Sequence, residues 1–66
     1  MTNIENDLQE PAIVYKRGDW PGINTTHQTL REALMDISRR SDSDQRQTEI
    51  KIKGKTLRYE DFSALI

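Results

Sequence analysis

The stretch that most constrains the fold lies near the end of the 66-residue chain, over residues 48–66. Ile50 and Ile52 alternate there with lysines, a period-two pattern that is typical of a half-buried strand. Gly54 can supply the positive φ that a two-residue hairpin turn needs, with Lys53 as the first residue of that turn. The pattern therefore predicts a tight β-hairpin. It spans about residues 48–59 and pairs Ile52 with Lys55, Ile50 with Leu57, and Thr48 with Tyr59.

This register gives the hairpin one apolar and one polar face, and a slip of one residue would expose the apolar side chains. After the hairpin, Glu60 and Asp61 stand where a helix N-terminus prefers negative charge. Phe62 follows, with apolar residues three and four positions later, so a short terminal helix is expected to fold back on the apolar face. The apolar face would carry Ile50, Ile52, Leu57 and Tyr59, and the polar face Glu49, Lys51, Thr56 and Arg58, with Glu49 opposite Arg58.

Upstream of the hairpin, the sequence predicts one strand and one helix. Residues 12–16 are rich in side chains that favour strands. Thr25 and Gln28 fit a capping box at the start of a helix over about residues 25–38. From Leu30 onward this helix carries apolar residues at i, i+3, i+4 and i+7, which is one stripe to be buried. The predicted core is Ile13, Tyr15, Leu30, Ala33, Leu34, Ile37, Ile50, Ile52, Leu57, Tyr59, Phe62, Leu65 and Ile66.

Two polar segments flank these elements. Residues 1–10 are polar and acidic, and we expect them to form a flexible N-terminus. Residues 38–47 hold no aliphatic or aromatic side chain, which predicts a mobile connector. The whole pattern predicts one small α+β domain over residues 11–66, in the order β-α-β-β-α, with the main helix packed on the C-terminal hairpin.

Composition makes the expected core small. Hydrophobic residues are 33% of the chain and charged residues 32%, and there is no cysteine to form a stabilising disulfide. A chain of this length buries only about 60% of its unfolded surface. We therefore expect another protein, or a second copy of the chain, to complete the core. The longest apolar run, residues 12–15, is too short to cross a membrane, so we expect a soluble protein in the cytoplasm.

Candidate chemical groups are few. His27 is the only histidine, and neither a second histidine nor a cysteine is present to complete a metal site. Glu60 and Asp61 are adjacent acids, but the helix dipole explains them better than acid–base catalysis. We therefore expect no catalytic residue, metal, cofactor or small-molecule substrate.

Two sets of residues are candidates for binding. The leading set is apolar and would bind another protein, although Trp20 could instead anchor its own loop on the core. The alternative set is basic and would bind nucleic acid, although lysines on an edge strand also guard against aggregation, and no aromatic residue interrupts the basic face. An anionic protein partner is a further possibility for the same basic residues, because electrostatic steering does not depend on the partner's chemistry. A third hypothesis is inhibition of a host enzyme by the acidic N-terminus. The protein-binding candidates are Trp20, Tyr59, Phe62 and Ile66, and the nucleic-acid candidates are Lys51, Lys53, Lys55 and Arg58.

The last third of the chain, together with the helix before it, resembles the small W-type head–tail joining proteins of tailed phages. Gly54 would match the hairpin turn of that family, Tyr59 the end of the strand, and Phe62 and Leu65 the stripe of the second helix. The resemblance implies a structural role in the virion, at the portal end of a filled head. Together with the small core, it predicts a non-enzymatic interaction protein that docks on a larger assembly.

Overall fold

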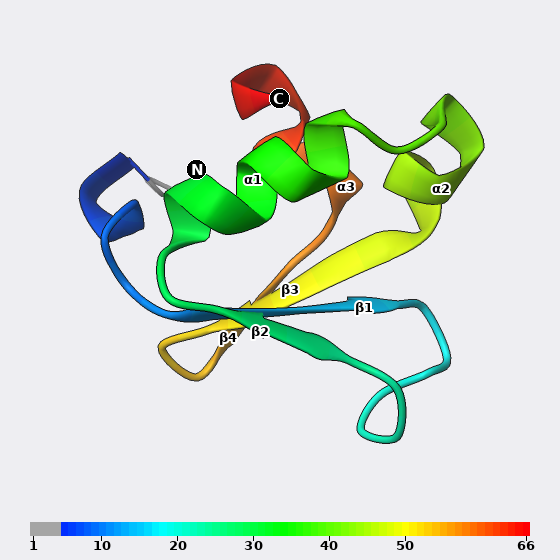
Figure 1. Ribbon diagram of the computed structural model, residues 1–66, viewed down its shortest axis with the longest axis horizontal. Coiled ribbons are helices and arrows are strands. Elements are labelled where there is room, and N and C mark those ends of the chain that lie inside the picture. The colour runs from blue at the N-terminus through cyan, green and yellow to red at the C-terminus, as the bar shows by residue number, and fades with distance from the viewer. Residues whose placement is uncertain (1–4) are drawn as a thin grey trace.

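The computed structural model describes residues 5–66 as a four-stranded antiparallel sheet with helices on one side of it (Figure 1). The strands are β1 (Ala12–Lys16), β2 (Thr25–His27), β3 (Thr48–Ile52) and β4 (Lys55–Leu57). The helices are α1 (Leu30–Ser38), α2 (Asp42–Gln47) and α3 (Tyr59–Phe62), with 3₁₀ turns at Glu5–Asp7 and Ser63–Leu65. The fold class is α+β, as predicted, but the order of the main elements is β-β-α-α-β-β-α.

The strands are arranged in the order β2-β1-β3-β4, so β1 and β3 lie at the centre. The C-terminal hairpin has the predicted register, with Ile50 opposite Leu57 and Ile52 opposite Lys55. Its turn residues both have positive φ, 50° at Lys53 and 76° at Gly54. In the sheet, β2 and β3 lie on opposite sides of β1. The segment that contains α1 and α2 connects them. The first strand therefore joins the sheet and holds its two hairpins together.

The core lies between the sheet and the helices. The buried stripe of α1 is the predicted one, and Phe62 of α3 is completely buried beside it. From the sheet, alternate residues of β1, β3 and β4 point toward the helices, as the register requires. The main hydrophobic cluster consists of Ala12, Val14, Leu30, Ala33, Leu34, Ile37, Ile50, Ile52, Leu57 and Phe62.

Ile13 and Tyr15 share one face of β1 and Tyr15 is buried, as predicted, but the prediction that this face enters the main cluster was wrong. Ala12 and Val14 point to the helices, whereas Ile13 and Tyr15 lie on the other face, opposite Lys51 and Glu49 of β3. The run of apolar residues in β1 offers a hydrophobic side chain to either face, so the sequence pattern does not choose between them. The pairing of β1 with β3 determines which face of β1 enters the core.

Three further predicted core residues lie at its edge or outside it. Tyr59 is the first residue of α3 and not a strand residue paired with Thr48, and its ring packs on Phe62 at a centroid distance of 5.9 Å. Ile66 is also only partly buried, and Leu65 is 39% exposed. The second strand of the hairpin is shorter than predicted because the backbone turns into α3 at Arg58, whose N–H donates to the Asp61 carboxylate at 3.0 Å.

The main helix begins later than predicted. Thr29 is its N-cap, and the Thr29 hydroxyl accepts a hydrogen bond from the Glu32 backbone N–H at 3.2 Å. Thr25 instead begins β2, which pairs with the outer edge of β1. Both positions fit a capping signature, but a helix from Thr25 would leave this edge of β1 unpaired. Tertiary pairing thus overrides the local signal.

The expected connector at residues 38–47 contains the helix α2. Ser41 caps it by accepting a hydrogen bond from the Asp44 N–H at 3.2 Å. The Gln45 side chain donates to the carbonyl oxygen of Arg40, at 3.1 Å, just beyond the end of α1. The helix has no buried residue of its own, and its end is tied to β3 by the Thr48 hydroxyl, which donates to the Asp44 carbonyl at 2.7 Å. Polar contacts with neighbouring elements stabilise a segment that lacks apolar residues.

The expected flexible N-terminus is partly tied to the fold, although residues 1–4 of that segment lie outside the described residues. Asp7 is 5% exposed and binds the ammonium groups of Lys53 and Lys55 at 3.3 and 3.1 Å. The hydrogen bond from Lys55, with that from Lys53, lowers the pKa of the Asp7 carboxyl despite its burial. Leu8 packs against the core, and its carbonyl accepts the backbone N–H of Arg31 at 3.1 Å. These contacts join the N-terminus to the turn of the second hairpin and to α1.

Candidate interaction surface

The sheet has a second face, which none of the helices within residues 5–66 covers. Figure 1 shows the helices above the sheet and the loop between β1 and β2 on the other side. In the two central strands, Ile13 and Tyr15 of β1 lie opposite Lys51 and Glu49 of β3 on this open face. Thr56 of β4 continues the row beyond Lys51. The face therefore presents polar, charged and aromatic side chains next to each other.

Trp20 lies over this open face. Its ring is 5.1 Å from that of Tyr15, with an angle of 39° between the ring planes. The Lys51 ammonium is 5.6 Å from the centroid of the Trp20 ring, within range of a cation–π interaction. Trp20 nevertheless remains 40% exposed, whereas Tyr15 beneath it is only 5% exposed. The tryptophan thus anchors its own loop and also presents an aromatic surface to solvent.

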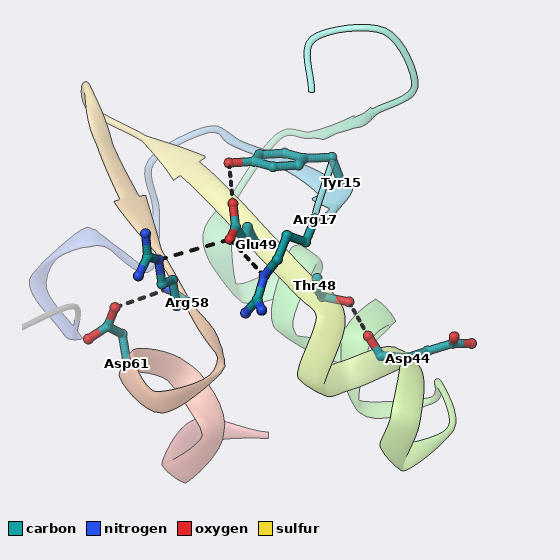
Figure 2. A network of polar contacts seen from close by, with 7 residues as sticks. All are labelled: Tyr15, Arg17, Asp44, Thr48, Glu49, Arg58 and Asp61. Atoms are coloured by element: carbon teal, nitrogen blue, oxygen red, sulfur yellow. Dashed lines mark hydrogen bonds and ion pairs between the residues drawn. The ribbon is translucent and has the colours of Figure 1, made fainter. Parts of the chain in front are cut away.

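Glu49 is the centre of a polar network on the same face (Figure 2). The Tyr15 hydroxyl donates to one carboxylate oxygen at 3.0 Å. The other oxygen lies 3.4 Å from Arg17 Nε and 3.9 Å from Arg58 Nε. Burial, and then the hydrogen bond and negative charge of Glu49, raise the pKa of the Tyr15 phenol. Glu49 thereby accepts a hydrogen bond from the tyrosine and lies within ion-pair distance of two guanidinium groups.

These side chains form one group, here named the open-face cluster. Three of its members are cations and one is a carboxylate, so the cluster has a formal charge of +2. Because the chain as a whole carries −1, the rest of the molecule carries −3. The open-face cluster consists of Tyr15, Arg17, Trp20, Glu49, Lys51 and Arg58.

The four candidates for protein binding fall on opposite sides of the sheet. Trp20 belongs to the open-face cluster, whereas Tyr59, Phe62 and Ile66 lie on the helical side. Phe62 is 0% exposed and presents no surface to a partner in this conformation. Tyr59 and Ile66 are partly buried against the core. Trp20 therefore has the most accessible aromatic ring of the set.

The four basic candidates also separate into two pairs. Lys51 and Arg58 lie in the open-face cluster, and the Lys51 ammonium donates to the Thr56 hydroxyl at 2.7 Å. Lys53 and Lys55 instead neutralise the nearly buried Asp7. The open face adds what the hairpin sequence lacks, because Tyr15 and Trp20 place aromatic rings beside the basic residues.

Three members of the cluster were not among the sequence candidates. Tyr15 was assigned to the core, Arg17 to the turn over residues 17–22, and Glu49 only to a pair with Arg58. The cross-strand signal between Glu49 and Arg58 was visible in the hairpin pattern, and their side chains do approach. Nothing local shows that β1 lies beside β3, so the contribution of Tyr15 and Arg17 could not be read from the pattern.

A second surface feature lies on the helical side. Met35 of α1 is 52% exposed, and Leu65 is 39% exposed. Together with Leu8, Leu34 and Ile66 they line an apolar groove of about 320 Å³. One of these lining residues, Ile66, is a protein-binding candidate from the sequence.

Two of the candidate chemical groups, His27 and Asp61, lie close to polar groups of their own fold. His27 Nε2 lies 3.4 Å from the Asp36 carboxylate, which also binds Arg40 at 2.9 Å. Asp61 caps the start of α3. Within the part of the chain that the structure describes, no group of three or more histidine, cysteine or acidic side chains is placed to hold a metal ion.

Comparisons with models of protein families, with curated proteins and with solved structures gave no match for this chain. In the described range, no helix has both the length and the apolar character that a membrane crossing requires.

Proposed function

We propose that this protein is a non-enzymatic interaction module that docks on a larger protein assembly through the open-face cluster. The observation that carries the proposal is the position of Trp20, which packs against Tyr15 and lies near Lys51, yet is 40% exposed on a sheet face that none of the described helices covers. Tryptophan, tyrosine and arginine are the residues most enriched at the energetic centres of protein interfaces. A tryptophan already held in place loses little conformational entropy on binding.

The chemistry of the cluster favours binding over catalysis. Its carboxylate, Glu49, is already engaged by Tyr15 and faces two arginines. The six residues of the cluster include no serine, cysteine or histidine that could act as a nucleophile or a proton shuttle. The resemblance of the last third to W-type joining proteins supports a phage or prophage assembly as the partner. The host cytoplasm and the virion are the places where such a partner would be met.

Affinity capture with three forms of the protein tests the proposal. The wild type, Trp20→Ala and Met35→Ala would be immobilised and exposed to nuclease-treated extracts of the host, with and without phage particles. Met35→Ala is the matched control, because it also removes an exposed apolar side chain but on the helical side. We expect the wild type and Met35→Ala to retain the same protein and Trp20→Ala to lose it. Equal capture by all three forms would contradict the proposal.

A second copy of the chain is one form that the protein partner could take. Light scattering after size exclusion would show a dimer that Trp20→Ala dissociates and Met35→Ala does not. The reverse pattern, with dissociation by Met35→Ala, would place the self-association in the apolar groove instead of on the open face.

Binding of nucleic acid is a second candidate function, because Tyr15 and Trp20 share a face with Lys51 and Arg58. Aromatic rings and cations on one surface are the usual means of binding single strands. This function predicts binding of single-stranded DNA or RNA that weakens steeply with salt. It also predicts that Lys51→Gln with Arg58→Gln weakens binding more than Lys53→Gln with Lys55→Gln. Equal effects of the two pairs, or no binding at low salt, would exclude it.

A further inference from the structure

The open-face cluster differs in charge from the rest of the molecule. It carries a formal +2, against −3 for the remainder of the chain. Complementary charge raises the rate at which a partner associates, and like charge disfavours the binding of other partners. An anionic partner would therefore be attracted to this face more than to the rest of the molecule, which carries net negative charge.

The two arginines of the cluster are exposed, whereas Lys51 is half-buried. The Arg17 and Arg58 side chains are 65% and 64% exposed, and each directs its Nε toward Glu49. Lys51 is held between the Thr56 hydroxyl and the Trp20 ring. Arginine forks bind carboxylates through two parallel hydrogen bonds, and a side chain that is already restrained loses less entropy when it does so.

We propose that the open-face cluster binds an acidic segment of a protein, in which carboxylates reach Arg17, Lys51 and Arg58 while an apolar side chain packs on the exposed side of Trp20. This inference rests on the proposed function, since it names the chemistry of the partner at the same site. The complementarity has two parts, one of charge and one of apolar surface, and both are present within the six residues of the cluster.

The same face suits a nucleic acid strand less well. Strand-binding surfaces stack successive bases on successive aromatic rings, and here Tyr15 is 5% exposed, which leaves Trp20 as the cluster's only accessible ring. A strand that extends beyond the cluster would meet the net negative charge of the remaining surface. Glu49, at the centre of the site, would also repel phosphate groups. A short acidic peptide avoids the first two of these penalties.

The fluorescence of Trp20, the only tryptophan in the chain, measures binding directly. The probe is a ten-residue peptide that alternates Asp and Glu around a central Leu, and its controls are the same peptide with Asn and Gln and an oligothymidylate of ten nucleotides. We expect the acidic peptide to change the fluorescence at a lower concentration than either control. The affinity should fall between 50 and 200 mM salt because the charges are exposed.

Substitutions locate the contacts. Arg17→Gln with Arg58→Gln should weaken peptide binding at least about fivefold, from the loss of charge-assisted hydrogen bonds. Arg39→Gln with Arg46→Gln is the matched control, since it removes two exposed arginines on the helical side, and it should leave the affinity within about twofold. Equal weakening by the two pairs would overturn the inference.

Other outcomes separate this inference from the proposed function. If the acidic peptide binds no better than its Asn/Gln counterpart while protein capture still depends on Trp20, the acidic segment is wrong and the docking module stands. If the oligothymidylate binds more tightly than the acidic peptide, nucleic acid is the ligand and the acidic segment is wrong. If capture does not depend on Trp20, the proposed function fails, and the inference that rests on it fails as well.

Discussion

The two faces of the sheet are built from the same strands but have opposite character. On the covered face, Val14 and Ile50 lie opposite each other and are 2% and 0% exposed beneath the helices. One residue along, Tyr15 and Glu49 form the next pair and face the side without helices. The covered face is apolar and closely packed, whereas the open face carries hydrogen bonds, ion pairs and an exposed indole ring.

Because of this difference, the covered face supplies most of the stability, whereas the open face is available for binding. Burial of apolar side chains supplies most of the favourable free energy of folding, and here it is concentrated on the covered face. Ion pairs whose arginines are about two-thirds exposed contribute little to stability, because water and salt screen them. The open face can therefore carry binding residues whose substitution leaves the fold intact.

The largest expected effect compares Phe62 with Trp20, one aromatic residue from each face. Phe62→Ala should lower the free energy of unfolding by about 3–5 kcal/mol, because it leaves a cavity at a fully buried site. Trp20→Ala should cost about 1 kcal/mol, chiefly from the lost contact with Tyr15. Urea unfolding followed by far-UV circular dichroism measures both, since it does not need the tryptophan. If Trp20→Ala lowered the free energy of unfolding more than Phe62→Ala, the covered face would not be the main source of stability.

The next effect concerns the helix that covers the sheet. Thr29→Ala should destabilise the protein by about 1 kcal/mol, because it removes the side chain that caps α1. Thr25→Ala, in the exposed edge strand β2, should change stability by less than about 0.5 kcal/mol. Thermal unfolding of the two variants gives the comparison. Equal losses would mean that the helix begins at Thr25 after all.

A pH-dependent effect concerns the attachment of the N-terminus to the covered side. The pKa of Asp7 is lowered in the folded protein by Lys55 and Lys53, so the ionised carboxylate favours folding. This contribution is present above the unfolded pKa of about 3.9 and is lost as the pH falls through the lower folded value. Asp7→Asn should therefore lower the urea midpoint at pH 7. The further decrease in the urea midpoint between pH 7 and pH 3 should be smaller in this variant than in the wild type.

Asp44 gives the control for this experiment. Lys16 lowers the pKa of Asp44 in the same way, so some acid sensitivity should remain in Asp7→Asn. Urea titrations of Asp7→Asn and Asp44→Asn at the two pH values measure both contributions. An unchanged dependence on pH in Asp7→Asn would show that the N-terminal contacts do not stabilise the fold.

The smallest effect on stability belongs to the open face. Glu49→Gln keeps an acceptor for the Tyr15 hydroxyl and should change the free energy of unfolding by less than about 1 kcal/mol. It should lower the pKa of Tyr15, because the nearby negative charge is lost, although burial still holds that pKa above its ordinary range. NMR titration of the tyrosine rings measures this, with Tyr59 as the internal reference. An unmoved Tyr15 pKa would show that Glu49 does not hold the ring.

How much of the fold follows from local pattern differs from element to element. Thr29 and Ser41 are real helix caps, and the capping rules applied at Thr25 also fit them. Applied at Thr29 and Ser41, the same capping signature predicts both the later start of α1 and the helix in the polar connector. The choice between competing caps depends on whether Thr25 is needed to pair with β1, which is a tertiary matter.

The amino-acid pattern alone determined the second hairpin and the buried stripe of α1. The hairpin register follows from the alternation around Ile50 and from the turn at Gly54, and both signals lie within a few residues. Only the tertiary structure decided which face of β1 enters the core, because four consecutive apolar residues satisfy either choice. That decision places Tyr15 beside Glu49 and beneath Trp20, and it creates the open-face cluster. The physical reason is that a site assembled across strands depends on long-range pairing, which a local pattern does not encode.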